Sequence, residues 1–368
     1  MRFVELRCNV GETPTLPKMF LHFSAWSDFF FTKNLVYRIG CAVLFTLFFR
    51  GTGLMRLLVF CLFFAVAVFK VPLLASEPIE ILCINVRLST ANDKENSWSN
   101  RKELLLSVLK ERNYDFIGGQ EVIISPSDAH NQIKYLSDNL PEYGVLFLCR
   151  EKNPNRGEGT PVFYRKDRWL CDEQEQGTYW LSDTPDEPGS VTWEGQSNCP
   201  RVVTGGLFHE INAQGEKTGK SLYVYSTHFD HVGEIPRQKL AALIMERIAA
   251  RKQQTVPVVL IGDLNCGEKS PSVRSLKGET VVLGGEEKIP NLKFLDTFRV
   301  VHPDEQNIAT FHGFRGPSYD ESGKMRGYKI DYIFVTPDIQ VKEAEIIRAH
   351  KEGRYPSDHY PVRAVIGF

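Results

Sequence analysis

The chain has 368 residues, of which 42% are hydrophobic and 24% charged, with 44 lysines and arginines against 45 aspartates and glutamates. This composition is typical of a globular protein with ample material for a core, and it excludes disorder, collagen and coiled coil. Residues 1–76 carry eight basic and three acidic side chains, which leaves 36 basic and 42 acidic ones, a net charge of −6, in the rest. Because proteins that hold nucleic acid through its phosphates are usually basic, this balance disfavours a nonspecific nucleic-acid binder.

Two apolar stretches, residues 39–49 and 57–69, come first in the chain, and each is shorter than the roughly 20 residues of a comfortable membrane span. The second stretch follows Met55-Arg56, a short segment with one positive charge, and a small residue, Ala75, comes six positions after its end. This order is typical of a signal peptide over residues 55–75 that starts at Met55. We therefore expect an exported domain over residues 76–368, in the periplasm, outside the cell or anchored facing outward.

Two alternatives remain open for the N-terminal segment. Residues 55–75 could stay in place as an uncleaved anchor that associates the protein with a membrane. Residues 1–54 are interpreted either as an over-extended reading frame or as a membrane-associated segment.

Eight cysteines are present, and three of them lie before residue 76. The other five form no CxxC pair and no Cys/His cluster with zinc spacing, which argues against a cysteine metal site. Export permits a disulfide, and Cys171 with Cys199 is the candidate pair because both lie in loop-rich sequence.

From residue 79 onward, short strand-like runs alternate with a few helical patterns. The pattern predicts helices at 101–111 and 236–250, and surface loops at 150–160 and 182–200. Many strands with few helices and no linker indicate one two-sheet α/β sandwich with helices outside. The predicted strands are 79–86, 116–117, 146–149, 160–164, 202–210, 221–227, 256–261, 328–335 and 362–368.

Polar side chains recur at the ends of these predicted strands. Because strand ends on one rim of a sheet converge, a carboxylate from each could build a site for a hard cation. The residues in question are Asn85, Gln120-Glu121, Thr227-His228, Asp263-Leu-Asn265, Asp331 and Ser357-Asp358-His359.

These six motifs, in this order over residues 79–368, resemble those of the endonuclease/exonuclease/phosphatase superfamily. That group contains pancreatic-type deoxyribonuclease, abasic-site endonucleases, neutral sphingomyelinases, inositol polyphosphate 5-phosphatases and Nocturnin-like deadenylases. The resemblance implies a four-layer α/β sandwich of the deoxyribonuclease-I-like type. The stretches 96–98, 181–185, 227–231 and 310–313 look most like an exported bacterial branch.

The resemblance also implies a metal site and a base. Glu121 would be the principal ligand of Mg²⁺ or Mn²⁺, helped by Asn85 and Asp358, because such an ion neutralises the charge that makes phosphoesters resist attack. Asp263 would orient or deprotonate the attacking water, and Asn265 would bond the same water or a phosphoryl oxygen.

The implied histidines act on the phosphate. His359 would sit against it, oriented and kept charged by Asp331, and His228 would donate to a phosphoryl oxygen. A second group could line the substrate pocket, although structural salt bridges or loop hydrogen bonds explain its members equally well. That group comprises His231, His312, Arg156, Glu158 and Arg201.

The expected function is therefore divalent-metal-dependent hydrolysis of a phosphoester by a monomer, with metal-activated water attacking phosphorus in line. The acidic domain favours a small or lipid-linked phosphoester, while a nuclease of endonuclease or 3′-5′ exonuclease and deadenylase type is the first alternative. A non-catalytic, membrane-tethered binding protein is the second, and the intact catalytic set argues against it.

Overall fold

A computed structural model describes residues 77–283, 286–288, 290–323 and 325–368 of the chain. The expected signal peptide or anchor, and the segment before it, lie outside the described residues. Within these ranges, no helix combines the length and the apolar character that a membrane crossing requires.

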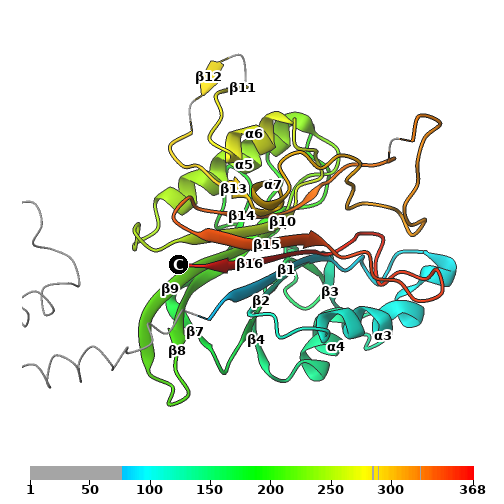
Figure 1. Ribbon diagram of the computed structural model, residues 1–368, viewed down its shortest axis with the longest axis horizontal. Helices are drawn as coiled ribbons and strands as arrows, with labels where there is room; N and C mark the ends of the chain where they lie inside the picture. Colours follow the sequence, from blue (N-terminus) through cyan, green and yellow to red (C-terminus); the bar gives the residue numbers. More distant parts are fainter. Residues whose placement is uncertain (1–76, 284–285, 289, 324) are drawn as a thin grey trace, which may run out of the picture. The chain divides into compact units, whose positions relative to one another are not determined.

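Two six-stranded sheets form the framework (Figure 1). The first has the order β15-β16-β1-β2-β6-β4, and the second has the order β13-β14-β10-β9-β8-β7. In the first sheet the strands are β1 (Ile79–Asn85), β2 (Phe116–Gln120), β4 (Tyr143–Leu146), β6 (Val162–Arg165), β15 (Gln340–Ile346) and β16 (Val362–Gly367). In the second they are β7 (Trp169–Trp180), β8 (Val202–Ile211), β9 (Lys217–His228), β10 (Val258–Asp263), β13 (Leu295–Asp296) and β14 (Asp331–Val335).

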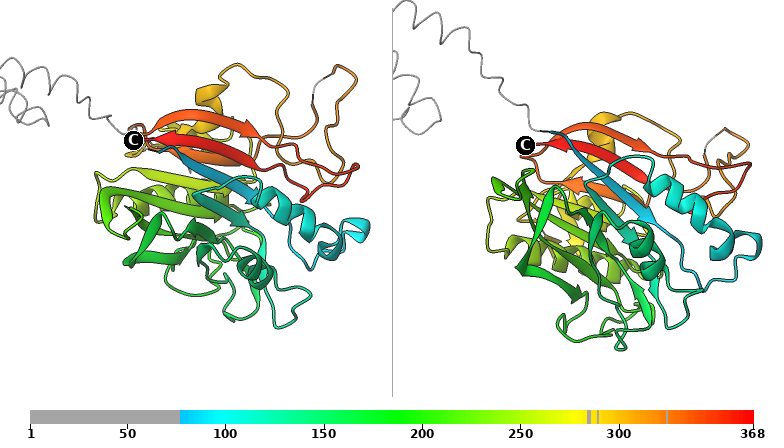
Figure 2. Two further views of the ribbon diagram at one scale, coloured as in Figure 1. Left: turned by 60° about the horizontal axis from the view of Figure 1, so that its bottom comes forward. Right: turned by 90° about the horizontal axis from the view of Figure 1, so that it is seen from below.

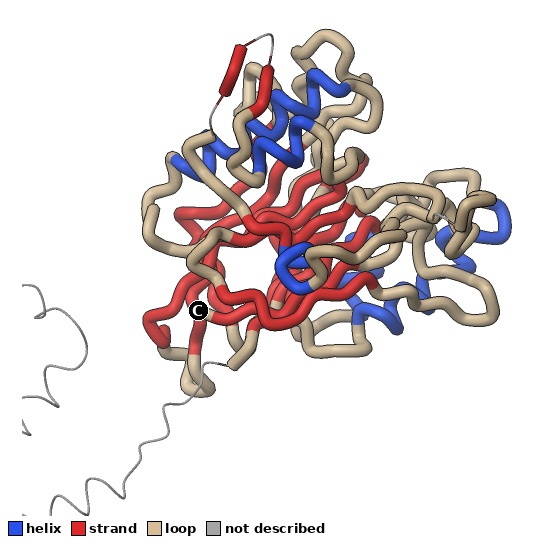
Figure 3. Tube along the Cα trace, turned by 45° about the horizontal axis from the view of Figure 1, so that its top comes forward, coloured by secondary structure: helices blue, strands red, loops and turns tan. Residues whose placement is uncertain are grey.

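Helices cover the outer faces of both sheets (Figures 1 and 3). On the first sheet lie α3 (Trp98–Leu109) and α4 (Gln132–Asn139), and α5 (Glu234–Ala249) and α6 (Pro271–Leu276) cover the second. The smaller elements are η1 (Lys94–Asn96), α7 (Thr297–Val301), the pair β3 (Val122–Ile124) with β5 (Gly157–Gly159), and the pair β11 (Val281–Leu283) with β12 (Glu286–Lys288).

Three apolar clusters separate these four layers. The middle cluster joins the facing sides of the two sheets and includes Ile81 of β1, Ile261 of β10 and Ile333 of β14, all fully buried. The sheets approach so closely that a Cβ added at Gly118 of β2 would lie 2.6 Å from Cγ2 of Ile261. The expected two-sheet, four-layer sandwich is therefore confirmed.

The chain closes on itself beside its first described strand. β16, near the C-terminus, pairs antiparallel with β1, and β2 pairs parallel with β1 on the other side. Figure 2 shows the C-terminal strand in red next to the blue first strand. This pairing brings the last motif of the chain, just before β16, to the same rim as Asn85 at the end of β1.

Several predicted details need correction. The strand expected at 146–149 is instead β4 at Tyr143–Leu146, and the predicted loop 150–160 contains the short strand β5. The helix expected at 101–111 starts one turn earlier, at Trp98.

The expected disulfide is also absent from the structure, since all five cysteines of the described residues are free thiols. Cys171 lies on β7, where its Sγ contacts the Gln176 side chain. Cys199 instead lines the cleft described below.

Candidate active site

Strand register assembles half of the site from a single row of residues. Asp263, the last residue of β10, is paired with His228 of the parallel strand β9 and with Asp331 of the antiparallel strand β14. Residues paired across neighbouring strands project to the same face at a spacing of about 5 Å. Three polar side chains that lie far apart in the sequence therefore meet where β9 and β10 end and β14 begins.

The other half comes from the first sheet. Asn85 ends β1 opposite Gln120 of β2, and Glu121 follows in a left-handed backbone conformation with φ of 60°. A non-glycine residue with positive φ is uncommon and marks a place where the chain accepts strain to aim a side chain.

A buried arginine fixes this half to the C-terminal loop. Arg101 of α3 donates to the carbonyl oxygens of Val86 and Arg87 and to that of Pro356, at 2.6 to 3.0 Å. The Ser357 hydroxyl donates to the carbonyl oxygen of Asn85 at 2.6 Å. These bonds hold the Asn85 strand end against the Asp358-His359 segment.

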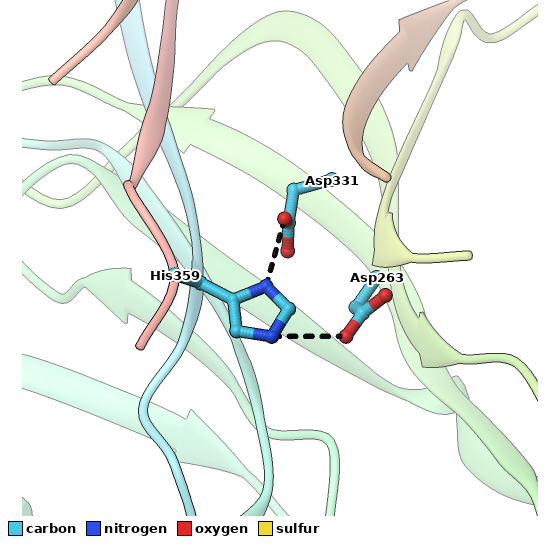
Figure 4. A group of neighbouring side chains, drawn as sticks. All are labelled: Asp263, Asp331 and His359. Atoms are coloured by element: carbon cyan, nitrogen blue, oxygen red, sulfur yellow. Dashed lines mark hydrogen bonds and ion pairs between the residues drawn. The ribbon is translucent and has the colours of Figure 1, made fainter. Parts of the chain in front are cut away.

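His359 stands between two carboxylates (Figure 4). Its Nδ1 lies 2.9 Å from Oδ2 of Asp331, and its Nε2 lies 3.8 Å from Oδ2 of Asp263. Burial acts to lower the pKa of His359, but the Asp331 and Asp263 carboxylates outweigh it and raise that pKa well above its usual value. The imidazole is therefore held as a cation, oriented by Asp331.

These three side chains also place one ligand atom each within 4.8 Å of one another, a grouping that could itself hold a metal ion. The Nδ1 atom of His359 is bonded to Asp331, so only its Nε2 could bind an ion there. Because Mg²⁺ and Mn²⁺ prefer oxygen ligands, we interpret the trio as an oriented histidine with its two carboxylates.

A more suitable cation site lies around Glu121. The Asn85 side-chain amide donates to Oε1 of Glu121 and to Oδ2 of Asp263, each at 3.0 Å, so the three side chains are locked together. Asp358 is 5% exposed, and burial raises its pKa above the usual value. Carboxylate oxygens are donors that Mg²⁺ and Mn²⁺ prefer, so Glu121 and Asp358 fit a hard divalent cation. Oδ1 of Asn85 accepts from the Arg87 backbone amide at 2.9 Å, so Asn85 would bind an ion only with its side-chain amide turned over.

Arg87 supplies positive charge at this position. Its guanidinium lies 3.9 Å from Oε2 of Glu121 and 3.7 Å from Oδ2 of Asp358, and it forms a bidentate pair with Asp93 at 3.0 Å. Arg87 therefore neutralises part of the carboxylate charge at this position, and a divalent cation would bind beside its guanidinium.

The hydrogen bonds around His228 differ from the expectation that it donates to a phosphoryl oxygen. The Asn265 amide nitrogen donates to the Phe229 carbonyl at 3.0 Å and to Nε2 of His228 at 2.9 Å. Flipping the amide would set two oxygens against each other at Phe229, so Nε2 of His228 is the acceptor. The His228 proton then lies on Nδ1, 3.4 Å from Oε1 of Glu158.

A cleft of about 390 Å³ connects the two halves of the site. Of the residues expected to bind substrate, Arg201, His231 and Glu158 line it, and Arg201 donates to Nδ1 of His231 at 2.7 Å. Arg201 is 2% exposed, and its Nε lies 3.9 Å from Oδ2 of Asp230. Its Nε and Nη1 make no hydrogen bond among the described residues, and buried donors of this kind are costly.

Two expected substrate residues lie elsewhere. Arg156 is exposed in the turn before β5 and does not line the cleft, because the turn at residues 153–156 directs the chain outward. His312 is buried behind the site, where its ring stacks on Tyr360 at a centroid distance of 4.0 Å. Burial lowers the pKa of His312 to about 4, which fits a neutral packing residue.

The cleft also contains residues that the motifs did not indicate. Arg150 lines it and pairs with Glu158 at 2.5 Å, and the ring of Phe311 lies 5.0 Å from that of His359. Arg87 could have been predicted as a cleft residue from the sequence, because it follows Asn85 by only two positions. Arg150 had no such signal, since it lies in a loop without a motif.

Comparisons with known proteins identify the family and agree with the fold. The sequence profile of the Endonuclease/Exonuclease/phosphatase family matches residues 82–359. The structure resembles an endonuclease/exonuclease/phosphatase from Bacteroides vulgatus, with a TM-score of 0.64 and 29% identity over 79% of this chain and 98% of that one. It also resembles a mannosyl-6-phosphatase of Bacteroides thetaiotaomicron, with a TM-score of 0.61 and 26% identity over 79% of this chain and 100% of that one.

Curated sequences match over shorter stretches. An exodeoxyribonuclease of Bacillus subtilis is 29% identical over 122 residues, which cover 31% of this chain and 46% of the relative. The chain spans about half the length of the curated relatives it matches. Members of the family are phosphoester hydrolases and typically use divalent metals. With its sandwich fold and its row of His228, Asp263 and Asp331, this chain belongs to the endonuclease/exonuclease/phosphatase family.

Proposed function

We propose that the protein hydrolyses a small phosphoester with the help of a divalent cation. The observation that carries this proposal is the distribution of charge in the cleft. Both signs of charge line the cleft: the carboxylates of Glu121, Glu158, Asp263 and Asp358, and the guanidinium groups of Arg87, Arg150 and Arg201. A cleft with both signs of charge suits a cation and a phosphoryl group together.

Each residue has a chemical part in this proposal. Glu121, Asn85 and Asp358 would hold Mg²⁺ or Mn²⁺, which supplies charge neutralisation at the phosphoryl oxygens. Asp263 takes the proton from the attacking water. Nε2 of the charged His359 donates to a phosphoryl oxygen, and the free donors of Arg201 bind the remaining oxygens.

His228 acts through Asn265 in this arrangement. Because Nε2 of His228 accepts from the Asn265 amide, the ring orients Asn265 beside Asp263. Nδ1 of His228 faces Glu158, whose pKa is lowered to about 2 by Arg150 and His228 against the opposing effect of burial. An ionised Glu158 thus favours the Nδ1-protonated form of His228.

The likeness to a mannosyl-6-phosphatase favours a small substrate. The alternative is a nuclease, which the short match to an exodeoxyribonuclease favours. A binding protein without catalysis would have no chemical reason to keep Asp263, Asp331 and His359 in bonding range.

A substrate panel with a salt series separates the two enzymes. The full chain with Mg²⁺ is assayed on hexose phosphates, inositol phosphates, sphingomyelin, DNA and RNA. For a small substrate, we expect KM to change little between low and moderate salt. A polynucleotide held through several phosphates would instead lose orders of magnitude in affinity, and efficient degradation with such a salt slope would establish the nuclease.

Export is a separate proposal that rests on the sequence alone. We propose that residues 55–75 direct the protein out of the cytoplasm and that the mature chain begins at Ser76. Expression of the full reading frame, fractionation and N-terminal sequencing test this. A mature product that retains residues 1–54 would contradict it.

A further inference from the structure

A second pocket of about 770 Å³ opens directly beside the catalytic cleft. The two share the lining residues Asn265 and Ile330, so they adjoin where β10 ends and β14 begins. The second pocket lies between the N-terminal turn of α5, the loop at 265–270, residues 305–308, Met325 and residues 327–330, and the loops of this part of the chain extend on the right of Figure 1. A group attached to a phosphate in the cleft could therefore extend into it.

Three of the four cations in the walls of this pocket are already neutralised by the protein, and the fourth, Lys269, is exposed and has no ion pair among the described residues. Arg237 pairs with Glu234 at 2.8 Å, and Arg299 forms a bidentate pair with Glu268 at 2.6 and 2.8 Å. The buried Lys329 lies 2.8 Å from Asp296.

This pairing determines the kind of group that fits. A polynucleotide or polyanion needs several unpaired cations that follow its phosphates, and among the described residues that line this pocket only Lys269 is unpaired. A neutral polar group does not disturb the existing pairs. Its hydroxyls can bond to the side chains of Gln306 and Asn307, which are exposed at the pocket.

An aromatic ring stands at the pocket and is almost uncovered. Tyr328 is 73% exposed, although large apolar surfaces are normally buried. The ring packs beside Gly267, where an added Cβ would lie 3.7 Å from Cδ1 of Tyr328. An aromatic ring with an open face offers a flat surface for the C–H face of a sugar ring.

We infer that this second pocket, which we call the leaving-group pocket, binds the alcohol half of the substrate, and that this alcohol is a neutral, polyhydroxylated ring such as a hexose. The inference rests on the proposed function and deepens it. Tyr328 is then a specificity-determining residue, because it contacts the sugar and not the phosphoryl group.

Kinetics of Tyr328→Ala in the full chain test the leaving-group pocket. KM is measured for mannose 6-phosphate, and inorganic phosphate is used as a competitive inhibitor whose Ki reports the catalytic cleft alone. We expect Tyr328→Ala to raise KM about tenfold, the size of one lost aromatic contact, and to change the Ki of phosphate less than about twofold. Tyr328→Phe should restore the wild-type KM, since it keeps the ring.

Tyr319 provides a matched control, because it is a 53% exposed tyrosine of the same segment that does not line the pocket. Tyr319→Ala should leave both constants unchanged. Equal effects of Tyr328→Ala and Tyr319→Ala on KM, or Mg²⁺-dependent turnover of other phosphoesters without any of mannose 6-phosphate, would overturn this inference alone. Absence of Mg²⁺-dependent turnover on every phosphoester would overturn the proposed function and the inference with it.

Discussion

Asp263 and His359 belong to different sheets, yet Oδ2 of Asp263 lies 3.8 Å from Nε2 of His359. Asp263 ends β10 of the second sheet, and His359 precedes β16 of the first. The distance therefore depends on how the two sheets pack across their shared core. In the mechanism we propose, these two buried side chains act on the same phosphoester, Asp263 on the attacking water and His359 on a phosphoryl oxygen.

The first prediction concerns the base. Asp263→Asn keeps the shape of the side chain but cannot take a proton from water. We expect kcat to fall about 10²- to 10⁴-fold, the usual contribution of a positioned general base, with KM little changed. Steady-state kinetics on the best substrate of the panel measure this, with the exposed Asp338→Asn as control. Wild-type kcat in Asp263→Asn would remove this residue from the mechanism.

The second prediction concerns the pair of Asp331 and His359. If Asp331 acts only by orienting and charging the imidazole, losing both costs little more than losing His359 alone. A double-mutant cycle of Asp331→Asn and His359→Gln measures this in kcat/KM, with thermal unfolding to check the fold. Fully additive losses would show that the two residues act separately.

The third prediction concerns metal binding. Glu121→Gln removes one anionic ligand while keeping a hydrogen-bond acceptor for the Asn85 amide. We expect Mn²⁺ affinity, measured by calorimetry without substrate, to fall by at least about tenfold, the scale of effects near metal sites. Glu246→Gln, exposed on α5, is the control. Unchanged Mn²⁺ affinity in Glu121→Gln would move the cation to other residues.

The order of the motifs predicted the site's core because strand register is local and regular. Asp263 and His228 end neighbouring strands and Asp331 begins a third, so the pairing of these strands brings the three residues together. The apolar runs of these strands can be recognised in the sequence. The positions of Arg150 and Arg156 were not predictable. They lie six residues apart in one loop, and only the turn before β5 decides that Arg150 lines the cleft while Arg156 faces solvent.

The sequence pattern also failed to predict two elements, β7 and α4. β7 is a long edge strand with the polar run Asp172-Glu-Gln-Glu-Gln176, so its sequence lacks the apolar alternation that predicts a strand. The helix α4 has only three buried residues in eight, and it is held by Asn131, whose side chain accepts from the Lys134 amide. Both elements therefore depend on contacts with the rest of the fold more than on their local sequence.

The fourth prediction concerns acid stability through Glu158. Its pKa in the folded protein, about 2, lies below the unfolded value of about 4.3. Ionised Glu158 therefore contributes stability that is fully present above about pH 4.3 and is lost as the pH falls toward 2. Urea unfolding of wild type and Glu158→Gln at several pH values should show a difference in free energy of unfolding that shrinks on acidification.

Glu151→Gln is the control for this series, because Glu151 also contacts Arg150 but its side chain is 36% exposed. The same series on Glu151→Gln separates the effect of burying the carboxylate from the effect of removing a partner of Arg150. A difference between wild type and Glu158→Gln that stays constant from pH 6 to pH 3 would contradict the lowered pKa.

The most direct test of the account is phosphate release by the full chain with Mg²⁺ and with EDTA, on the phosphoester panel described above. The account predicts turnover of at least one small phosphoester with Mg²⁺, loss of that turnover with EDTA, and recovery when Mg²⁺ is restored. Turnover that persists undiminished in EDTA would contradict the cation site at Glu121, Asn85 and Asp358 and with it the proposed mechanism.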